Sequence, residues 1–217
     1  MSLVTRQLVI TMRGNLVIIS SPSGGGKGTL IKEVLEALPD VGYSVSLTTR
    51  PPRFGEEDGR HYHFVTRRQF EEEIANDAFL EYAEVHGNLY GTSRIQAERM
   101  MSEGQDVILE IDVQGALQVM DKVPEVVSIF IMPPSFDVLK ARLISRATEK
   151  NEDLELRLRN SHDEIEQFTK FDYVVVNDRV AVAARKLAAI ILAERQQRDR
   201  QKEAVQDILD SFGSSKP

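Results

Sequence analysis

The residues best suited to chemistry form a glycine-rich run near the amino terminus, Ser21-Pro22-Ser23-Gly24-Gly25-Gly26-Lys27-Gly28-Thr29. The run follows a short β-branched segment, Leu16–Ile19, and precedes apolar residues at helical spacing, so it joins a predicted buried strand to a predicted helix. A loop in that position points backbone N–H groups and a helix N-terminus at an anion, and Lys27 adds a mobile positive charge. We therefore predict a phosphate-binding loop for a nucleoside triphosphate.

Two positions of this loop depart from the common pattern G-x-x-x-x-G-K-[ST]. Ser21 stands at the first glycine position, and Gly28 stands where a hydroxyl residue often touches Mg²⁺, with Thr29 one residue later. Either Thr29 substitutes for the missing hydroxyl or water completes the metal shell, and the sequence leaves both open. The alternative interpretation, a glycine-rich turn with an exposed lysine, is disfavoured by the strand before the loop and the helix after it.

A second group of candidate binding residues follows the first predicted helix. Arg50 and Arg53 flank a Pro-Pro pair, whose fixed φ angles present the two guanidinium groups at little ordering cost. Paired arginines with tyrosine hydroxyls, here Tyr62 and Tyr90, suit a terminal phosphate. Glu81 lies in an otherwise apolar, strand-like run, where a carboxylate needs a partner or contacts a ligand. Each of these residues alone is also compatible with a solvated surface charge.

Taken together, these segments resemble the guanylate kinase family. The resemblance rests on the Ser-Pro-Ser-Gly-x-Gly-Lys loop and on Ser44–Glu56, Asp58-Gly59, Tyr62–Val65, Phe79–Thr92, Ile111–Ala116 and Val175–Asp178. It runs from about Asn15 to about Leu192, with its motifs in order and correctly spaced. It implies transfer of the γ-phosphoryl group of ATP to GMP on an α/β fold, a phosphate-loop parallel sheet flanked by helices, with a GMP-binding insertion and a mobile lid.

The resemblance also implies a role for individual residues. The ATP-binding residues it implies are Ser23, Gly24, Gly25, Gly26, Lys27, Gly28, Thr29 and, near the adenine, Asn177. Those for GMP are Ser46, Glu81, Thr92 and Asp112 at the guanine, and Arg50, Arg53, Tyr62 and Tyr90 at the phosphate, with Glu56 orienting the arginines. The catalytic residues it implies are Lys27, Arg142, Arg146 and Arg157, with Mg²⁺ as cofactor. Positive charge is what the reaction needs, because the transition state spreads negative charge over the transferred group.

Apolar runs predict the elements that position these residues. Buried strands are predicted at Leu16–Ile19, Val107–Ile111, Val126–Ile131 and Tyr173–Val176, and helices at Leu30–Leu38, Ala116–Met120, Phe136–Leu143, Leu154–Ile165 and Val180–Leu192. Their alternation predicts a parallel sheet covered on both faces. The expected organisation is a leader outside the fold (1–14), a core (15–45 and 93–193) with a lid at about 144–160, an insertion (46–92) and a polar C-terminal helix or tail (194–217). The tail extends the last helix either over solvent or onto a partner subunit in a homo-oligomer.

The composition is that of a globular protein. The 217 residues are 41% hydrophobic, and 27 Lys plus Arg against 34 Asp plus Glu give a net charge of −7. This acidic balance argues against bulk nucleic-acid binding, and no apolar stretch approaches the length of a membrane span. The chain has no cysteines, which excludes disulfides, thiol catalysis and cysteine-based zinc sites. We expect a cytoplasmic protein whose partners are ATP and GMP, with neither nucleic acid nor membrane among them.

Two other functions fit parts of the pattern. The phosphate loop and the D-x-x-G run Asp112–Gly115 fit a GTPase, but the chain has no Asn-Lys-x-Asp motif for guanine, and the segment around Arg50 and Arg53 would have no role there. The second alternative is a guanylate-kinase-like binding module, which binds protein ligands and lacks parts of the phosphate loop. Lys27 and the loop glycines are all present here, which favours the enzyme.

Overall fold

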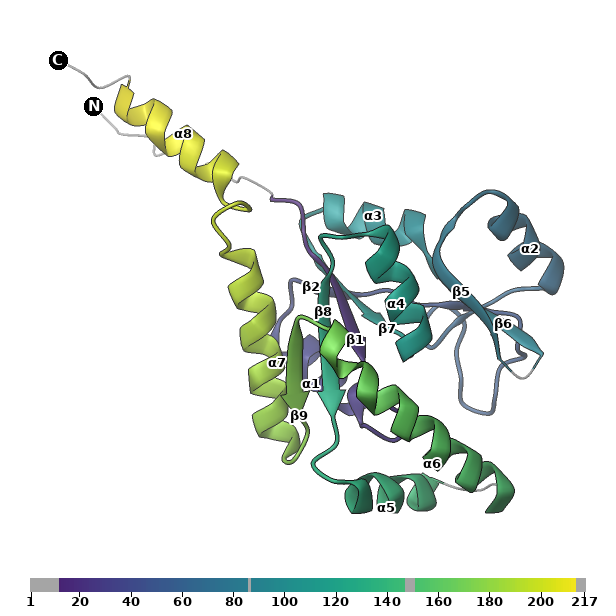
Figure 1. The fold of residues 1–217 in the computed structure, drawn as a ribbon. Helices are drawn as coiled ribbons and strands as arrows, with labels where there is room; N and C mark the ends of the chain where they lie inside the picture. Colours follow the sequence, from purple (N-terminus) through teal and green to yellow (C-terminus); the bar gives the residue numbers. More distant parts are fainter. Residues whose placement is uncertain (1–11, 86, 147–150, 214–217) are drawn as a thin grey trace.

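The computed structural model describes residues 12–85, 87–146 and 151–213, without the side chains of residues 146, 151–154, 203, 204 and 213. Residues 1–11 of the predicted leader, 147–150 of the predicted lid and 214–217 of the predicted tail lie outside the described residues. Within them, a five-stranded sheet carries helices on both faces, and a smaller four-stranded sheet lies to one side (Figure 1). The predicted α/β class with a parallel sheet flanked by helices is therefore confirmed.

The larger sheet is parallel throughout. Its strands lie in the order β2 (Val41–Tyr43), β7 (Asp106–Glu110), β1 (Leu16–Ser20), β8 (Val127–Met132) and β9 (Tyr173–Val176). Leu16 of β1 pairs with Val107, and Val17 pairs with Val127, so β1 is the central strand. The phosphate loop and the polar residues after β7 thus share the carboxyl edge of the sheet, where ligands of open α/β sheets bind. The predicted third strand begins one residue early, and β7 ends at Glu110 rather than Ile111.

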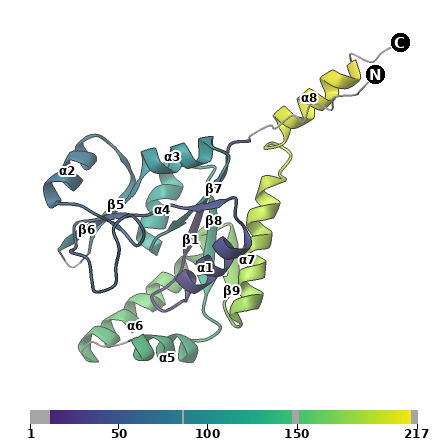
Figure 2. The same ribbon diagram turned by 180° about the vertical axis from the view of Figure 1, so that it is seen from behind.

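Both faces of the central strands β7, β1 and β8 are buried, as their continuous apolar runs predict, whereas Val174 and Val176 on the edge strand β9 are exposed. Helices α1 (Lys27–Ala37) and α7 (Val180–Arg195) pack on Val17 and Ile19, while α3 (Arg94–Ser102) and α4 (Val113–Lys122) pack on Leu16 and Ile18. Figure 2 shows the sheet from behind, with α1 and α7 nearest the viewer and α3 and α4 beyond the strands. Alternate residues of one strand therefore anchor opposite layers.

The smaller sheet is formed by residues 47–93, within one residue of the predicted insertion. Its strands lie in the order β4 (His63–Phe64), β3 (Leu47–Thr48), β6 (Asn88–Ser93) and β5 (Phe79–Val85). Helix α2 (Arg67–Ala75) begins with a capping box between Thr66 and Gln69, and it stacks Phe70 on Phe79 with ring centroids 4.5 Å apart. A side chain at Gly91 would meet both rings within 2.9 Å, so this strand position requires glycine.

Two helices lie below the carboxyl edge of the large sheet (Figure 1). They are α5 (Phe136–Arg146) and α6 (Asn151–Glu166), followed by the short 3₁₀ helix η1 (Gln167–Lys170) that leads into β9. Both helices fall where the apolar spacing predicts them. The residue range of the predicted lid, 144–160, includes the last residues of α5 and most of α6.

The two ends of the chain differ from the predicted boundaries. Gly14 is buried and donates its N–H to the Met101 carbonyl, so the fold begins before the predicted end of the leader. The last core helix, α7, stops at Arg195, where the N–H of the C-cap residue Gln196 donates to the Ala193 carbonyl, and the Arg195 guanidinium pairs with buried Asp106. The prediction that the tail extends this helix is therefore wrong.

A separate helix, α8 (Lys202–Gly213), follows a turn and projects from the body of the protein (Figure 1). It is amphipathic rather than polar, with the exposed apolar side chains Val205, Ile208, Leu209 and Phe212. Contact of this segment with a partner subunit stays a prediction. Among the described residues, no helix is long and apolar enough to cross a membrane.

Candidate nucleotide site

The phosphate loop has the backbone that its glycines allow. Gly24 and Gly26 have φ angles of 83° and 87°, in the left-handed region that favours glycine, and Gly26 is the N-cap of α1. Lys27 is the first residue of that helix, and Gly28 and Thr29 continue it at exposed positions. The loop thus presents successive N–H groups at a helix N-terminus, which is an anion-binding arrangement.

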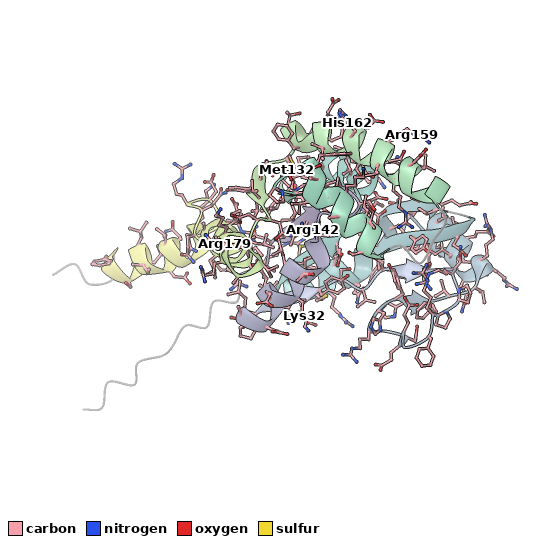
Figure 3. All side chains as sticks on the ribbon, turned by 90° about the horizontal axis from the view of Figure 1, so that it is seen from below. Lys32, Met132, Arg142, Arg159, His162 and Arg179 are labelled. Atoms are coloured by element: carbon pink, nitrogen blue, oxygen red, sulfur yellow. The ribbon has the colours of Figure 1, made fainter. Side chains whose placement is uncertain are left out.

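Two predicted site residues hold this loop in place. The carbonyl of Gly25 accepts hydrogen bonds from Asn177 Nδ2 at 3.0 Å and from Arg142 Nη1 at 3.2 Å. Arg142 also donates to the Asn177 carbonyl at 3.0 Å, so the two side chains and the loop form one network. Figure 3 shows Arg142 directed inward from α5 toward α1. Asn177, predicted near the adenine, is buried beneath the loop, and a Cβ at Gly26 would lie 2.6 Å from its amide nitrogen.

A cavity of about 390 Å³ extends from the phosphate loop to the smaller sheet. The predicted site residues that line it are Lys27, Ser46, Tyr62, Glu81, Tyr90 and Asp112. Residues that the sequence analysis did not assign to the site also line it, among them Tyr43, His61 and Glu110. Segments far apart in the sequence therefore meet around one volume that is large enough for a small polar ligand.

Glu81 is the buried acid of this cavity, with only 6% of its surface exposed. Its Oε1 accepts a hydrogen bond from the hydroxyl of Thr92 at 2.6 Å, across the β5–β6 pair. Burial raises the pKa of Glu81 to about 7; the Thr92 hydrogen bond lowers it, Asp112 raises it and Lys122 lowers it. Asp112 caps α4 by accepting from the Gly115 N–H at 2.8 Å. Two carboxylates thus face the same end of the cavity.

Arg50 is held in a defined orientation beside the tyrosines. Its Nη1 and Nη2 each donate to a carboxylate oxygen of Glu56 at 2.9 Å, and its guanidinium lies 5.4 Å from the ring centroid of Tyr62. The Arg50 hydrogen bond, helped by the Arg53 N–H, lowers the pKa of Glu56 to about 2. Glu56 therefore holds the Arg50 guanidinium, whereas the Arg53 side chain is exposed, and the role of both arginines at a nucleotide stays a prediction.

Glu110 connects the loop to the cavity. Its Oε1 lies 4.0 Å from Lys27 Nζ, and its Oε2 accepts from the Tyr43 hydroxyl at 3.2 Å. Burial and Glu110 raise the pKa of Tyr43. Glu110 could have been found from the sequence, because a polar residue that ends a buried parallel strand lies at the ligand edge. Tyr43 could not, because the three residues of β2 are too few to show a pattern.

The remaining predicted residues are more dispersed. Ser23 is exposed on the loop, and Arg157 lies half-buried on α6. The side chain of Arg146 lies outside the described residues. No three His, Asp or Glu side chains gather as a metal site within the described ranges. Oxygen groups beside the loop include the exposed Thr29 hydroxyl, the Glu110 carboxylate and the Glu164 carboxylate, which accepts from the Ser23 N–H at 3.1 Å.

A phosphate loop on a parallel sheet, opening into a polar cavity on an inserted sheet, defines a phosphate-loop nucleotide-binding protein with room for a second ligand. A family model described as guanylate kinase matches residues 13–194. The chain belongs to the guanylate kinase family.

Individual relatives agree with this assignment. The chain is 52% identical over 191 residues to a guanylate kinase of Clostridium perfringens (strain SM101 / Type A), covering 88% of each chain. It is 52% identical over 199 residues to a guanylate kinase of Neisseria meningitidis serogroup A, covering 92% of this chain and 97% of the relative. The crystal structure of guanylate kinase from Anaplasma phagocytophilum matches with a TM-score of 0.71 and 35% identity, over 88% of this chain and 92% of that one.

Proposed function

We propose that this protein transfers the γ-phosphoryl group of ATP to GMP, giving ADP and GDP. The observation that carries the proposal is the single cavity lined by Lys27 of the phosphate loop at one end and by Glu81 and Asp112 at the other. Such a cavity can hold an acceptor nucleotide with its phosphate toward the loop and its base between the two carboxylates. The opposite end of the loop stays available to ATP.

The guanine end is suited to donors on the ligand. Guanine presents N1–H and a 2-amino group on one edge, and an ionised Glu81 offers two acceptor oxygens to them. Asp112 can accept the second amine proton, and Ser46 can donate to the O6 oxygen. The Thr92 hydroxyl already donates its hydrogen bond to Glu81, so we propose that Thr92 orients Glu81. Adenine has an acceptor at N1 and no 2-amino group, so it would bring no donor to the buried carboxylate beyond the one that Thr92 supplies.

The phosphate of GMP has a cationic site next to this cavity. Its oxygens are bound by the guanidinium of Arg50, which Glu56 holds in place, and by the hydroxyls of Tyr62 and Tyr90. The exposed Arg53 adds a second guanidinium when the insertion closes. Because Glu56 fixes the arginine fork before the ligand arrives, little further ordering is needed on binding.

Transfer itself then needs positioning and positive charge rather than a protein nucleophile. An oxygen of the GMP phosphate attacks in line, while Lys27 and the loop N–H groups hold the ATP phosphates. Arg142, Arg146 and Arg157 supply further positive charge from the lid helices. Residues 144–160 close as a lid, which excludes water and suppresses ATP hydrolysis. Residues 46–92 act as the GMP-binding insertion.

The residues near the loop fit Mg²⁺ bound chiefly through phosphates and water. The available protein donors, Thr29 and Glu110, are oxygens, which magnesium prefers. A Cβ at Gly28 would lie 3.3 Å from Glu110 Oε1, so the missing side chain at 28 leaves room for this carboxylate. When bound, the ion neutralises charge on the ATP phosphates. Thr29 and Glu110 are the groups we expect to contact its water shell.

A coupled assay for ADP and GDP with ATP and a panel of nucleoside monophosphates tests the proposal. We expect turnover with GMP and almost none with AMP, CMP or UMP. Hydrolysis of GTP alone would indicate the GTPase alternative, and absence of both activities with an intact fold would indicate a binding module. Either result would refute the kinase assignment.

A further inference from the structure

One hydrogen bond joins α6, the helix that carries part of the proposed lid, to the phosphate loop. It is made by a residue that the proposed function does not use. The backbone N–H of Ser23 donates a hydrogen bond to Glu164 Oε2 at 3.1 Å, although the two residues are 141 positions apart. Ser23 precedes the left-handed Gly24 in the loop, and Glu164 lies in the last turn of α6. The contact therefore joins the carboxyl end of the lid helix to the loop that binds phosphate.

Glu164 lies on the same face of α6 as Arg157. The two residues are seven positions apart, which is about two helical turns, and Ser161 lies between them on the same stripe. Ser161 is fully buried, and its hydroxyl donates to the Arg157 carbonyl at 2.6 Å, so this stripe faces the protein. Arg159 and His162 are exposed on the outer side of α6 (Figure 3). Fixing Glu164 therefore fixes the rotation of α6 and the direction in which Arg157 is presented.

The surroundings of Glu164 argue against a role in attracting ATP. Burial raises the pKa of its carboxyl; the Ser23 N–H opposes this effect, Asp112 adds to it and Lys27 opposes it. Glu164 thus lies within the electrostatic field of the site, where its negative charge repels nucleotide phosphates. The hydrogen bond of Glu164 to the Ser23 N–H, rather than its negative charge, therefore explains why a carboxylate lies beside the phosphate loop.

We propose that Glu164 is a positioning residue that holds α6 to the phosphate loop through the Ser23 N–H and so places Arg157 over the transferring phosphate. The inference rests on the proposed function, because that function assigns Arg157 to this phosphate. This role of Glu164 requires a side chain long enough to reach the Ser23 N–H and an acceptor oxygen at its end. It does not require the negative charge.

Two conservative variants separate reach from charge. Glu164→Gln keeps an acceptor oxygen at the same distance and removes the charge, whereas Glu164→Asp keeps the charge and shortens the side chain by a methylene. We expect Glu164→Gln to keep kcat within about twofold, and Glu164→Asp to lower kcat about tenfold, the usual effect of one lost hydrogen bond, with KM for GMP unchanged. Asp163→Ala, which removes a charge from the exposed neighbouring position, should keep the wild-type kcat.

A double-mutant cycle then tests whether Glu164 acts through Arg157. In the Arg157→Ala background, Glu164→Asp should change kcat by less than about twofold, because the residue it positions is gone. A wild-type kcat in Glu164→Asp, an equal loss in Glu164→Gln, or full additivity with Arg157→Ala would overturn the inference. Failure of the proposed function is recognised separately, because the wild-type protein would then show no phosphoryl transfer to GMP.

Discussion

The two ends of the nucleotide cavity are built in different ways. At the end formed by the smaller sheet, the groups proposed to bind GMP are already held by protein partners, Glu81 by Thr92 and Arg50 by Glu56. At the phosphate-loop end, Arg142 is also held, by the Gly25 and Asn177 carbonyls, but Arg157 lies half-buried on the separate helix α6. The acceptor end, proposed for GMP, is thus preorganised apart from the exposed Arg53, whereas the donor end, proposed for ATP, needs α6 to bring Arg157 to the phosphate.

This difference matches the two tasks of a phosphotransferase. Discrimination among similar bases requires buried polar groups in fixed positions, which neighbouring strands provide. Transfer requires a site that opens to admit ATP and then excludes water, which helices attached at their ends can provide. Changes at the donor end should therefore lower turnover, and changes at the acceptor end should alter affinity and base preference.

The largest effect should come from the loop lysine. Lys27→Ala should lower kcat on the order of 10³-fold, because it removes a cation aimed at the transferred charge. Steady-state kinetics measures the loss, and thermal unfolding should show a fold close to the wild type. Lys32→Ala, at an exposed position of the same helix, is the control. Near wild-type turnover in Lys27→Ala would contradict the assignment of the phosphate loop to the phosphates of ATP.

A smaller effect is expected when the base-reading carboxylate becomes an amide. Glu81→Gln should reduce the GMP-to-AMP ratio of kcat/KM by roughly 10- to 100-fold, because the amide turns a donor toward a guanine donor. Turnover of both nucleotides by both proteins measures this ratio. Glu84→Gln on the exposed face of the same strand should leave it unchanged. An unaltered ratio in Glu81→Gln would remove Glu81 from guanine recognition.

The two arginines of the insertion should differ from each other. Arg50→Ala should raise KM for GMP by roughly 10- to 100-fold, the effect of losing a charge-assisted hydrogen bond. Arg53→Ala should raise it less, because that side chain starts exposed. The KM for ATP should change little in both, and Arg60→Ala serves as an exposed control in the same insertion. A loss of ATP affinity without a loss of GMP affinity would reverse the two ends of the cavity.

The smallest effect concerns pH. Because the pKa of Glu81 is about 7, its carboxyl gains a proton as pH falls through 7, and KM for GMP should rise severalfold between pH 7.5 and pH 6. Glu81→Gln should lose this dependence, and a pH-independent KM in the wild type would contradict it. Since the folded state raises this pKa from 4.5, it binds the proton more tightly than the unfolded state does. The contribution of Glu81 to stability should therefore fall as pH rises from about 4.5 to about 7.

Much of this arrangement could be predicted from the sequence because its signals are local. The loop Ser23–Thr29 lies between a strand and a helix that each show a clear apolar pattern, and the buried acid Glu81 interrupts an apolar run. The long motifs then indicate the family and the residues to examine. These features need only the chemistry of neighbouring residues.

Other features depend on contacts between distant segments and could not be predicted. Asn177 holds the Gly25 carbonyl across 152 positions, which makes it a support of the loop as well as a candidate ATP contact. Glu164 is one acid in a densely charged helix, and nothing in its spacing separates it from its exposed neighbours. The pairing of Arg195, the last residue of α7, with buried Asp106 joins residues 89 positions apart.

The preorganised acceptor end is tested most directly by calorimetric titration of GMP into the nucleotide-free protein, alone and with a non-hydrolysable ATP analogue. We predict that GMP binds in both cases, with a Kd for the free protein no more than about fivefold weaker, because the groups that hold it are in place before ATP arrives. GMP binding that is detected only when the ATP analogue is present would contradict the account.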